Sequence, residues 1–329
     1  MMEENNLIEV NNIYKHFPIK RKISDVIMGR KLREVKAVDG ISLNIRKNEI
    51  LSLVGESGCG KSTFARTLIR LYEPDRGEIM YDGKDIAHDN RSMLKDYNKK
   101  MQMVFQDPYS SLNPRMKIGD IFEEELAFHH ICRKEEMKEH IRQIIEKVGL
   151  PESALDRYPS EFSGGQRQRI GIARAIAVNP EFMIADEPVS ALDVSIQAQI
   201  LNLLLNLQKE YGLTILFISH DLRVVNYISD RVAVMYLGKI VELGTAKQIY
   251  DHYLHPYTEV LLKSAPNLDP RVRLEKPMIE GNPPSPIDLP NGCRFCKRCK
   301  KAKGLCFEEE PPLKEMEPGH FCACYQAAK

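Results

Sequence analysis

The segment 55–62, with the sequence GESGCGKS, constrains the fold of this chain more than any other feature. It matches the pattern G-x-x-x-x-G-K-[ST], whose glycines let the backbone turn successive N–H groups toward an anion. An apolar run at 48–54 precedes it, and a helix is predicted from Lys61 through Leu68, so the helix N-terminus also faces the phosphates. Strand, glycine-rich loop and helix in this order predict an α/β fold that holds the phosphates of a nucleoside triphosphate.

Two residues of this loop have separate predicted roles. Lys61 is expected to reach the β- and γ-phosphates, and the Ser62 hydroxyl to bind Mg²⁺. The alternative is a glycine-rich turn that carries Lys-Ser by chance, and the strand before it and helix after it count against that interpretation. The predicted nucleotide-binding residues here are Gly55, Ser57, Gly58, Cys59, Gly60, Lys61, Ser62 and Thr63.

Two acidic residues follow a second apolar run, FMIA at 182–185. A continuous apolar run of this length is typical of a buried parallel strand, and Asp186 stands at its carboxyl end, where ligands bind in open α/β sheets. Phosphoryl transfer needs a carboxylate near the metal and a group that orients the attacking water. We therefore predict that Asp186 holds Mg²⁺ and that Glu187 polarises the water.

Two further polar residues occupy comparable positions. His220 closes the apolar strand predicted at 214–218, and Gln106 follows the run 103–105. Either one alone would more often be an ordinary polar residue at a strand end. Their shared location at carboxyl ends of strands favours a role for His220 near the γ-phosphate and for Gln106 near metal and water.

A second rare string, FSGGQ at 162–166, completes a set of motifs. With it, residues 7–265 resemble an ABC-type ATPase subunit. The resemblance identifies residues 55–63 as the Walker A loop and 162–166 as the LSGGQ signature, with Phe in place of Leu. Asp186 and Glu187 then match the Walker B aspartate and the catalytic glutamate, and Gln106 matches the Q-loop glutamine. Residues 190–193, with Asp193, match the D-loop, and His220 matches the switch histidine. It also implies that an aromatic residue stacks on adenine, and Phe17 fits that place better than Tyr14.

The signature has a physical logic of its own. Ser163 and the two glycines open a helix predicted from Gln166 through Val178, which gives a second anion site at a helix N-terminus. In the family, Ser163, Gly164, Gly165 and Gln166 would face the γ-phosphate held by a partner subunit. The chain has one phosphate loop, one signature and no internal repeat. The resemblance therefore implies a sandwich dimer with a second ABC ATPase, which ATP binding closes and hydrolysis opens.

Three longer strings are similar to the oligopeptide/dipeptide importer group: SLNPR at 111–115, SALDVSIQAQ at 190–199 and HPYT at 255–258. The forms QDPY at 106–109 and HFP at 16–18 resemble the F-type ATPase of that group, the mate of a D-type subunit. The resemblance implies two integral membrane permease subunits, an extracytoplasmic peptide-binding protein, and a peripheral location on the cytoplasmic face of the plasma (inner) membrane. Nickel importers share much of the pattern, so import of nickel or another solute stays open.

Composition agrees with one cassette plus appendages. The chain has 329 residues and a formal net charge of +1, which does not indicate a nucleic-acid partner. We find no signal peptide and no apolar run of the ~18–20 residues that span a bilayer. The basic stretches at 20–22 and 30–31 are expected to form a solvated insertion, with lipid contact as the alternative. A soluble, non-transport ABC ATPase is the alternative function from another class; it would favour a basic groove or a long coiled-coil insertion, and neither is evident.

The predicted architecture is an α/β P-loop NTPase, an ABC cassette with a RecA-like core, an antiparallel β sub-sheet and a helical subdomain. The sub-sheet includes a strand and turn at 77–83, and the helical pattern covers about 114–179, including a helix at 135–150. A hairpin is expected at 231–242. Prolines mark a linker at 266–292, and a small Cys-rich tail occupies 293–329.

The tail carries six of the eight cysteines: Cys293, Cys296, Cys299, Cys306, Cys322 and Cys324. In a cytosolic chain such clustering indicates a metal rather than disulfides, and both zinc and an iron–sulfur cluster accept four cysteines. The family resemblance implies a [4Fe-4S] cluster on Cys293, Cys299, Cys306 and Cys324, which leaves Cys296 and Cys322 as extras. Zinc, and no metal at all, stay open as alternatives.

Overall fold

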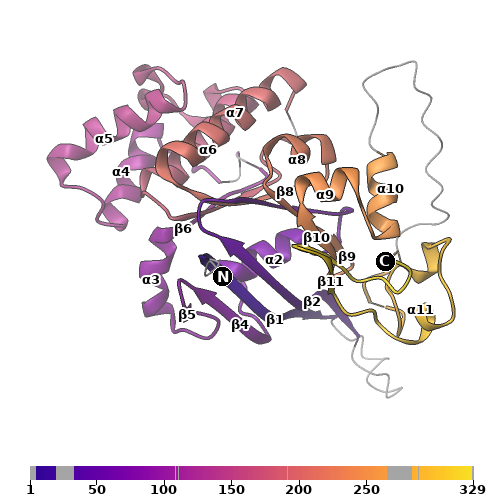
Figure 1. The fold of residues 1–329 in the computed structure, drawn as a ribbon. Coiled ribbons are helices and arrows are strands. Elements are labelled where there is room, and N and C mark those ends of the chain that lie inside the picture. The colour runs from indigo at the N-terminus through magenta and orange to yellow at the C-terminus, as the bar shows by residue number, and fades with distance from the viewer. Residues whose placement is uncertain are drawn as a thin grey trace. The chain divides into compact units, whose positions relative to one another are not determined.

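The fold is described from a computed structural model of the chain (Figure 1). The structure describes residues 5–19, 33–107, 109, 111–190, 192–264, 284–287 and 289–327. The predicted basic stretches at 20–22 and 30–31, Pro108, Ala191 and most of the Pro-rich linker lie outside these residues. The chain divides into two compact units: unit 1 is Met1–Ile45, Leu51–His88 and Ser219–Lys329, and unit 2 is Arg46–Ile50 and Asp89–Ile218.

Unit 1 contains the predicted antiparallel sub-sheet. Its strands are β1 (Asn6–Pro18), β2 (Glu34–Arg46), β4 (Arg76–Tyr81) and β5 (Lys84–Asp85), in the order β2-β1-β4-β5. β1 and β4 run antiparallel, with Ile8 opposite Tyr81. Ile8 and Val10 are buried while Glu9 between them is exposed, which is the two-residue alternation of a strand with one apolar face.

A second set of strands in unit 1 carries the phosphate loop. In order, they are β3 (Ile50–Val54), β9 (Arg231–Tyr236), β10 (Lys239–Thr245), β12 (His320–Cys322) and β11 (Lys314–Glu317). β3 and β9 are parallel and fully buried, as expected for continuous apolar runs. β9 and β10 form the predicted hairpin, and Leu237 and Gly238 both have positive φ at its turn, 43° and 84°.

The helices of unit 1 are short. They are α2 (Lys61–Leu68), α8 (Leu222–Ile228), α9 (Ala246–Asp251), α10 (Pro256–Ser264), the 3₁₀ turn η3 (Cys296–Arg298) and α11 (Leu305–Glu308). α2 matches the helix predicted after the glycine-rich loop. It is fixed in the core by Phe64, Ala65 and Leu68, each 0% exposed.

Unit 2 holds three parallel strands and the helical part of the chain. The strands are β6 (Met101–Val104), β7 (Phe182–Asp186) and β8 (Thr214–Ser219), with β7 in the middle. The helices are α3 (Arg91–Lys100), α4 (Ile118–Phe128), α5 (Lys134–Lys147), η1 (Glu152–Asp156), η2 (Pro159–Glu161), α6 (Gly164–Ala177) and α7 (Val194–Tyr211). Four of these elements, α4, α5, η1 and α6, contact one another within the range predicted for the helical subdomain.

Two helix boundaries differ from the prediction. α5 ends at Lys147, three residues before the predicted end, because Gly149 follows with φ 72° in the conformation that terminates helices. α6 begins at Gly164, two residues earlier than predicted, because Ser163 is its N-cap.

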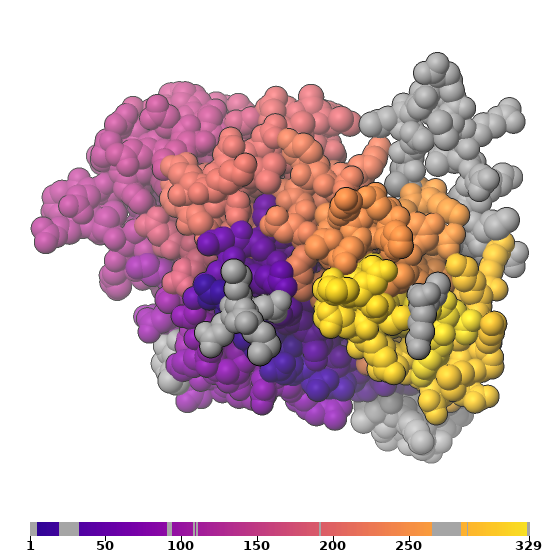
Figure 2. All heavy atoms as spheres, viewed as in Figure 1, coloured from indigo at the N-terminus to yellow at the C-terminus, as the bar shows by residue number. Residues whose placement is uncertain are grey.

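The Cys-rich tail is built into unit 1. β12 pairs with β10, placing Cys322 opposite Glu242 and Phe321 opposite Leu243. Figure 2 shows the C-terminal residues, in yellow, packed against the orange residues that precede them in the chain. The tail thus extends a sheet that already contains the phosphate-loop strand. In the part of the chain that the structure describes, no helix is both long and apolar enough to cross a bilayer.

Candidate nucleotide and metal sites

Backbone contacts explain the glycines of the phosphate loop. Gly60 has φ 110°, and a Cβ at this position would lie 2.0 Å from the carbonyl oxygen of Ala37. A Cβ on Gly55 would lie 2.2 Å from the carbonyl oxygen of Met235. Only glycine permits these approaches. Because Gly60 is also the N-cap of α2 and has no side chain to cap it, the first N–H groups of α2 stay available to a ligand.

Lys61 lies inside the curve of this loop. It is 5% exposed, and its Nζ donates to the carbonyl oxygens of Gly55 at 2.8 Å and Glu56 at 3.2 Å. Cys59 is buried beside it, with its Sγ 4.0 Å from the Lys61 Nζ. Burial raises the pKa of the Cys59 thiol, although the neighbouring ammonium acts in the opposite direction. The loop thus surrounds a positive charge where phosphates are expected.

In unit 2 the structure brings together two predicted catalytic residues. Asp186 ends β7 and is 1% exposed, and Glu187 follows it with φ 47°. A positive φ is uncommon for a residue with a side chain and is typical of functional sites. The Glu187 N–H donates to the Ile218 carbonyl at 3.0 Å, and Gln106 Nε2 donates to Glu187 Oε2 at 3.0 Å. The residues predicted as the Q-loop glutamine and the catalytic glutamate therefore form one hydrogen-bonded pair.

The signature residues form a closed cap at the start of α6. Ser163 Oγ accepts from the Gln166 N–H at 3.3 Å, and Gln166 Oε1 accepts from the Ser163 N–H at 3.0 Å. This reciprocal arrangement is a capping box. A Cβ on Gly165 would lie 2.5 Å from a methyl carbon of Ile196, so glycine allows α6 to pack closely on α7. Ser163 and Gly164 are exposed.

The D-loop is anchored by a residue to which sequence reasoning gave no role. Asp193 is the N-cap of α7, and Gln197 Nε2 donates to the carbonyl oxygens of Val189 at 3.1 Å and Leu192 at 3.0 Å. Gln197 was visible only as part of a family string, because an amide that holds a turn has no motif of its own.

His220 and Phe17 lie in unit 1. His220 follows β8 and is exposed. Phe17 is partly buried near the end of β1 and packs edge-on against Tyr72, with ring centroids 5.5 Å apart. The ring of Tyr14 is instead covered by the Arg76 guanidinium at 4.6 Å. The Phe17 ring also has a cation over one face, the Lys15 ammonium at 5.6 Å, so the choice of Phe17 for stacking on adenine stays a prediction.

Five cysteines line one small cavity of the tail together with His255: Cys293, Cys296, Cys299, Cys306 and Cys324. The four predicted cluster ligands are among them. Burial raises the pKa of the Cys293 thiol, and together with the effect of the neighbouring Cys296, Cys324 and Cys306 it brings this pKa to about 12. A thiolate at Cys293 therefore needs a compensating cation beside it. Cys322 is not part of this cavity; it is a buried residue of β12.

An orphaned buried atom tests whether a thiolate-held group fits this cavity. His255 is 1% exposed, and its Nδ1 accepts the Tyr257 N–H at 3.0 Å, so its Nε2 carries the proton. Among the described residues this buried Nε2 has no hydrogen-bond partner. A buried donor on a residue that lines a cavity together with five cysteines suits a sulfur-rich group. Still, no three or more His, Cys, Asp or Glu side chains in the described ranges are placed closely enough to hold a metal ion. The donor set fits, whereas its spacing is not that of a formed metal site.

A buried carboxylate ties the tail to the rest of unit 1. Glu242 is 0% exposed and accepts the N–H groups of Leu254 at 2.6 Å and His255 at 3.0 Å, the Thr258 hydroxyl, and His320 Nε2 at 2.9 Å. The network joins the HPYT segment, β10 and the tail strand β12. No motif marked Glu242, because a buried acid can be recognised only once its partners are placed.

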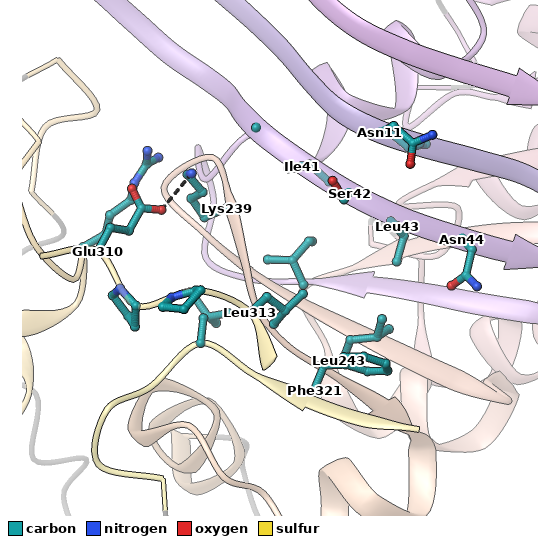
Figure 3. A pocket seen from close by; sticks show the side chains of 18 of the residues that line it. Asn11, Ile41, Ser42, Leu43, Asn44, Lys239, Leu243, Glu310, Leu313 and Phe321 are labelled. Atoms are coloured by element: carbon teal, nitrogen blue, oxygen red, sulfur yellow. Dashed lines mark ion pairs between the residues drawn. The ribbon is translucent and has the colours of Figure 1, made fainter. Parts of the chain in front are cut away.

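Unit 1 also has a groove with a volume of about 610 Å³ that no sequence motif predicted (Figure 3). Polar residues of β1 and β2, among them Asn11 and Ser42, line one side. Leu313 and Phe321 of the tail line the other, and Lys239 and Glu310 form an ion pair of 2.7 Å at one end.

Comparisons with known proteins identify the family to which this chain belongs. A family model for the ABC transporter matches residues 38–190, and one for the oligopeptide/dipeptide transporter, C-terminal region, matches residues 241–306. The oligopeptide transport ATP-binding protein AppF of Bacillus subtilis is 51% identical over 98% of both chains. The chain belongs to the ABC transporter ATP-binding proteins of the oligopeptide/dipeptide importer family.

A second relative supports the same family, and solved structures support the cassette fold. The dipeptide transport ATP-binding protein DppF of Haemophilus influenzae is 46% identical over 98% of this chain and 97% of its own. Among solved structures, cbiO1 of Clostridium perfringens has a TM-score of 0.64 at 26% identity, over 76% of this chain and 92% of that one. A dimeric post-hydrolysis structure of the cassette MJ0796, with ADP and Pi, has a TM-score of 0.64 at 27% identity, over 73% and 98% of the two chains. The predicted ABC cassette fold is confirmed, and the chain is an ABC ATPase.

Proposed function

We propose that this ATPase energises the import of oligopeptides or dipeptides through a membrane permease, as one half of a sandwich dimer with a D-type ABC ATPase. The observation that carries the proposal is the identity with AppF and DppF, which extends over nearly the whole chain, C-terminal region included. Support for the dimer comes from the exposed signature cap and from the dimeric cassette among the similar structures.

The residues of the chain divide the chemistry of ATP hydrolysis among them. Lys61 and the first N–H groups of α2 would bind the phosphates, and Phe17 would stack on the adenine. Ser62, Asp186 and Gln106 offer the oxygen ligands that Mg²⁺ prefers, and the ion would neutralise charge on the phosphates. Glu187 would polarise the attacking water, with its carboxylate oriented by Gln106, and His220 would contact the γ-phosphate.

The partners follow from the same assignment. We infer two integral membrane permease subunits, an extracytoplasmic peptide-binding protein that acts through them, and a position on the cytoplasmic face of the membrane. Import of nickel or another solute is the second candidate within the family. A soluble, non-transport ABC ATPase is the candidate from a different class.

Reconstitution tests these assignments together. The chain, a D-type mate and a permease pair of the same importer are placed in vesicles that contain ATP, and uptake of labelled peptides and of nickel is measured. Peptide uptake that Glu187→Gln abolishes is the expected result. Nickel uptake without peptide uptake would move the proposal to the second candidate. Failure to co-purify with any integral membrane subunit would contradict import altogether.

We further propose that Cys293, Cys299, Cys306 and Cys324 hold a [4Fe-4S] cluster, with zinc as the alternative. The support is the cavity that these thiols line and the Nε2 of His255, which has no hydrogen-bond partner in the part of the chain that the structure describes. The cluster would compensate the charge of the thiolates and cross-link the tail. His255 would donate its N–H to a sulfur atom.

Metal analysis of protein purified without oxygen tests the cluster. About four iron and four acid-labile sulfide per chain, with broad visible absorption, are expected. About one zinc and no iron would replace the cluster with a structural zinc site and leave the ATPase function unchanged. Cys296→Ser and Cys322→Ser serve as matched controls, because both side chains belong to the tail but neither is a proposed ligand.

A further inference from the structure

One arginine of the tail makes direct contact with the phosphate loop. Arg298 ends the 3₁₀ turn η3, one residue before Cys299. Its Nη1 donates to Glu56 Oε2 at 2.9 Å and its Nη2 to Glu56 Oε1 at 3.0 Å. The Arg298 side chain is 7% exposed and that of Glu56 is 23% exposed. A two-point guanidinium–carboxylate pair with this burial has defined geometry and is stronger than a surface ion pair.

The remaining contacts hold both partners of this pair. Arg298 Nη1 also donates to the Tyr236 hydroxyl at 3.1 Å, and the guanidinium lies 5.9 Å from the centroids of the Tyr236 and Phe295 rings. The Glu56 N–H donates to the Tyr257 hydroxyl at 2.8 Å. Glu56 is thus fixed through its backbone by the HPYT segment and through its side chain by the tail.

Glu56 lies where its position matters for nucleotide binding. It follows Gly55, the first glycine of the loop, and its carbonyl oxygen accepts from the Lys61 ammonium at 3.2 Å. A shift of Glu56 would therefore move the backbone of the loop and, with it, the carbonyl oxygen that accepts the hydrogen bond from Lys61.

We propose that Arg298 is a positioning residue for ATP binding, through which the Cys-rich tail holds the phosphate loop in its binding conformation. Arg298 acts through Glu56 and touches neither nucleotide nor reacting atoms. The role makes the tail a working part of the nucleotide site. It depends on the ATP-binding function of the loop and is independent of which metal the cysteines hold.

The test uses the full chain paired with its mate and measures the KM for ATP, kcat, thermal unfolding and metal content. Arg298→Met keeps the bulk of the side chain and removes its charge. We expect a KM about tenfold higher with kcat within about twofold of wild type. Arg298→Lys keeps the charge but cannot form the two-point contact, so its KM for ATP should lie between the KM of wild type and that of Arg298→Met. Lys301→Met is the matched control, since Lys301 is an exposed cation of the same tail that pairs with Glu259 at 3.6 Å.

A double-mutant cycle with Glu56→Gln separates positioning from general destabilisation. If Arg298 acts through Glu56, the double variant Glu56→Gln/Arg298→Met should be no worse than the more impaired single variant. The proposal would be overturned if the KM changes of Glu56→Gln and Arg298→Met were additive in the double variant. It would also be overturned if the KM for ATP were unchanged in folded Arg298→Met, or if KM rose equally in Lys301→Met. Should Arg298→Met fail to fold, Arg298→Lys and Glu56→Gln carry the same test. A wild-type chain that binds no ATP in this assay would contradict the ATPase function instead.

Discussion

Two helices of this chain present their N-termini as anion sites, α2 in unit 1 and α6 in unit 2, and they are built differently. The N-cap of α2 is Gly60, which offers no capping side chain, and the first residue of this helix is the buried Lys61. The N-cap of α6 is the exposed Ser163, and the first N–H groups of this helix are partly satisfied by the reciprocal bonds between Ser163 and Gln166. The first site is open to a ligand, whereas the second is closed on itself.

The difference indicates how each site is used. An uncapped helix start beside a buried ammonium needs an anion to complete it, so α2 is suited to bind nucleotide in a single chain. A self-capped helix start has hydrogen-bond partners for its capping groups when no ligand is bound. The Ser163 hydroxyl can then exchange its partner for a phosphate held by another subunit. The comparison predicts that changes near α2 affect binding, while changes in unit 2 affect turnover.

The largest expected effect is in unit 2. Glu187→Gln should leave ATP affinity unchanged and lower turnover by about 10²–10⁴-fold, because the amide cannot take up the proton of the attacking water. The pair should then persist in its closed, ATP-bound form. Single-turnover hydrolysis and gel filtration with ATP measure both effects. Hydrolysis close to the wild-type rate would mean that Glu187 does not have the assigned role.

Lys61→Ala tests the other half of the comparison. Removing the buried ammonium should weaken ATP binding by about 10²-fold, since a charge-assisted contact to phosphate is lost and the loop carbonyls of Gly55 and Glu56 lose their donor. Binding of a fluorescent ATP analogue to the single chain measures this loss. Thr67→Ser, within the same helix, is the control. Unchanged affinity in Lys61→Ala would contradict the role given to the open α2 site.

Some of this site could be predicted from sequence because its residues follow one another in the chain. The phosphate loop, Asp186 with Glu187, and Ser163 with Gln166 each occupy a short segment with a fixed local conformation. Arg298, Glu242 and Tyr257 could not be assigned roles in the same way. The Arg298–Glu56 pair joins residues 242 positions apart, and such a pair is specified by packing rather than by any local pattern.

The same reasoning accounts for the fold. The parallel strands, one strand of the antiparallel sub-sheet at 77–83 and the hairpin at 231–242 were predictable from apolar runs and turn residues, whereas the sub-sheet as a whole was implied by the family resemblance. The joining of β12 to β10 was not, because β12 has only three residues and a long segment separates it from β10. Short strands carry too little periodicity to be recognised alone.

Ser163→Ala should have a smaller effect on turnover, and this effect should appear only in the assembled pair. Loss of the cap should destabilise α6 by about 1 kcal/mol, and loss of the hydroxyl should lower paired turnover by about tenfold. ATP binding by the single chain should not change. Thr245→Ala is the matched control, because Thr245 and Gln248 form the same capping box on α9 outside the nucleotide motifs. Equal loss of turnover in both variants would reduce the role of Ser163 to helix stability.

The smallest expected effect concerns acid stability of the contact between the tail and β2. Asp39 is 8% exposed, accepts from Arg294, and lies 2.9 Å from His16 Nε2. Burial is the largest influence on the pKa of Asp39 and acts to raise it, but the Arg294 guanidinium, the hydrogen bond to His16 and the charge of Lys36 together outweigh burial, so the pKa of this carboxyl is lowered. A lowered pKa means that the stabilisation is complete above the unfolded value and is lost as pH falls through the folded value. Wild type should therefore lose more thermal stability than Asp39→Asn between pH 5 and pH 3, by a few degrees in Tm. If Tm falls equally with pH in wild type and Asp39→Asn, Asp39 does not stabilise the contact between the tail and β2 in this pH range. Arg298 would then be the tail contact to examine.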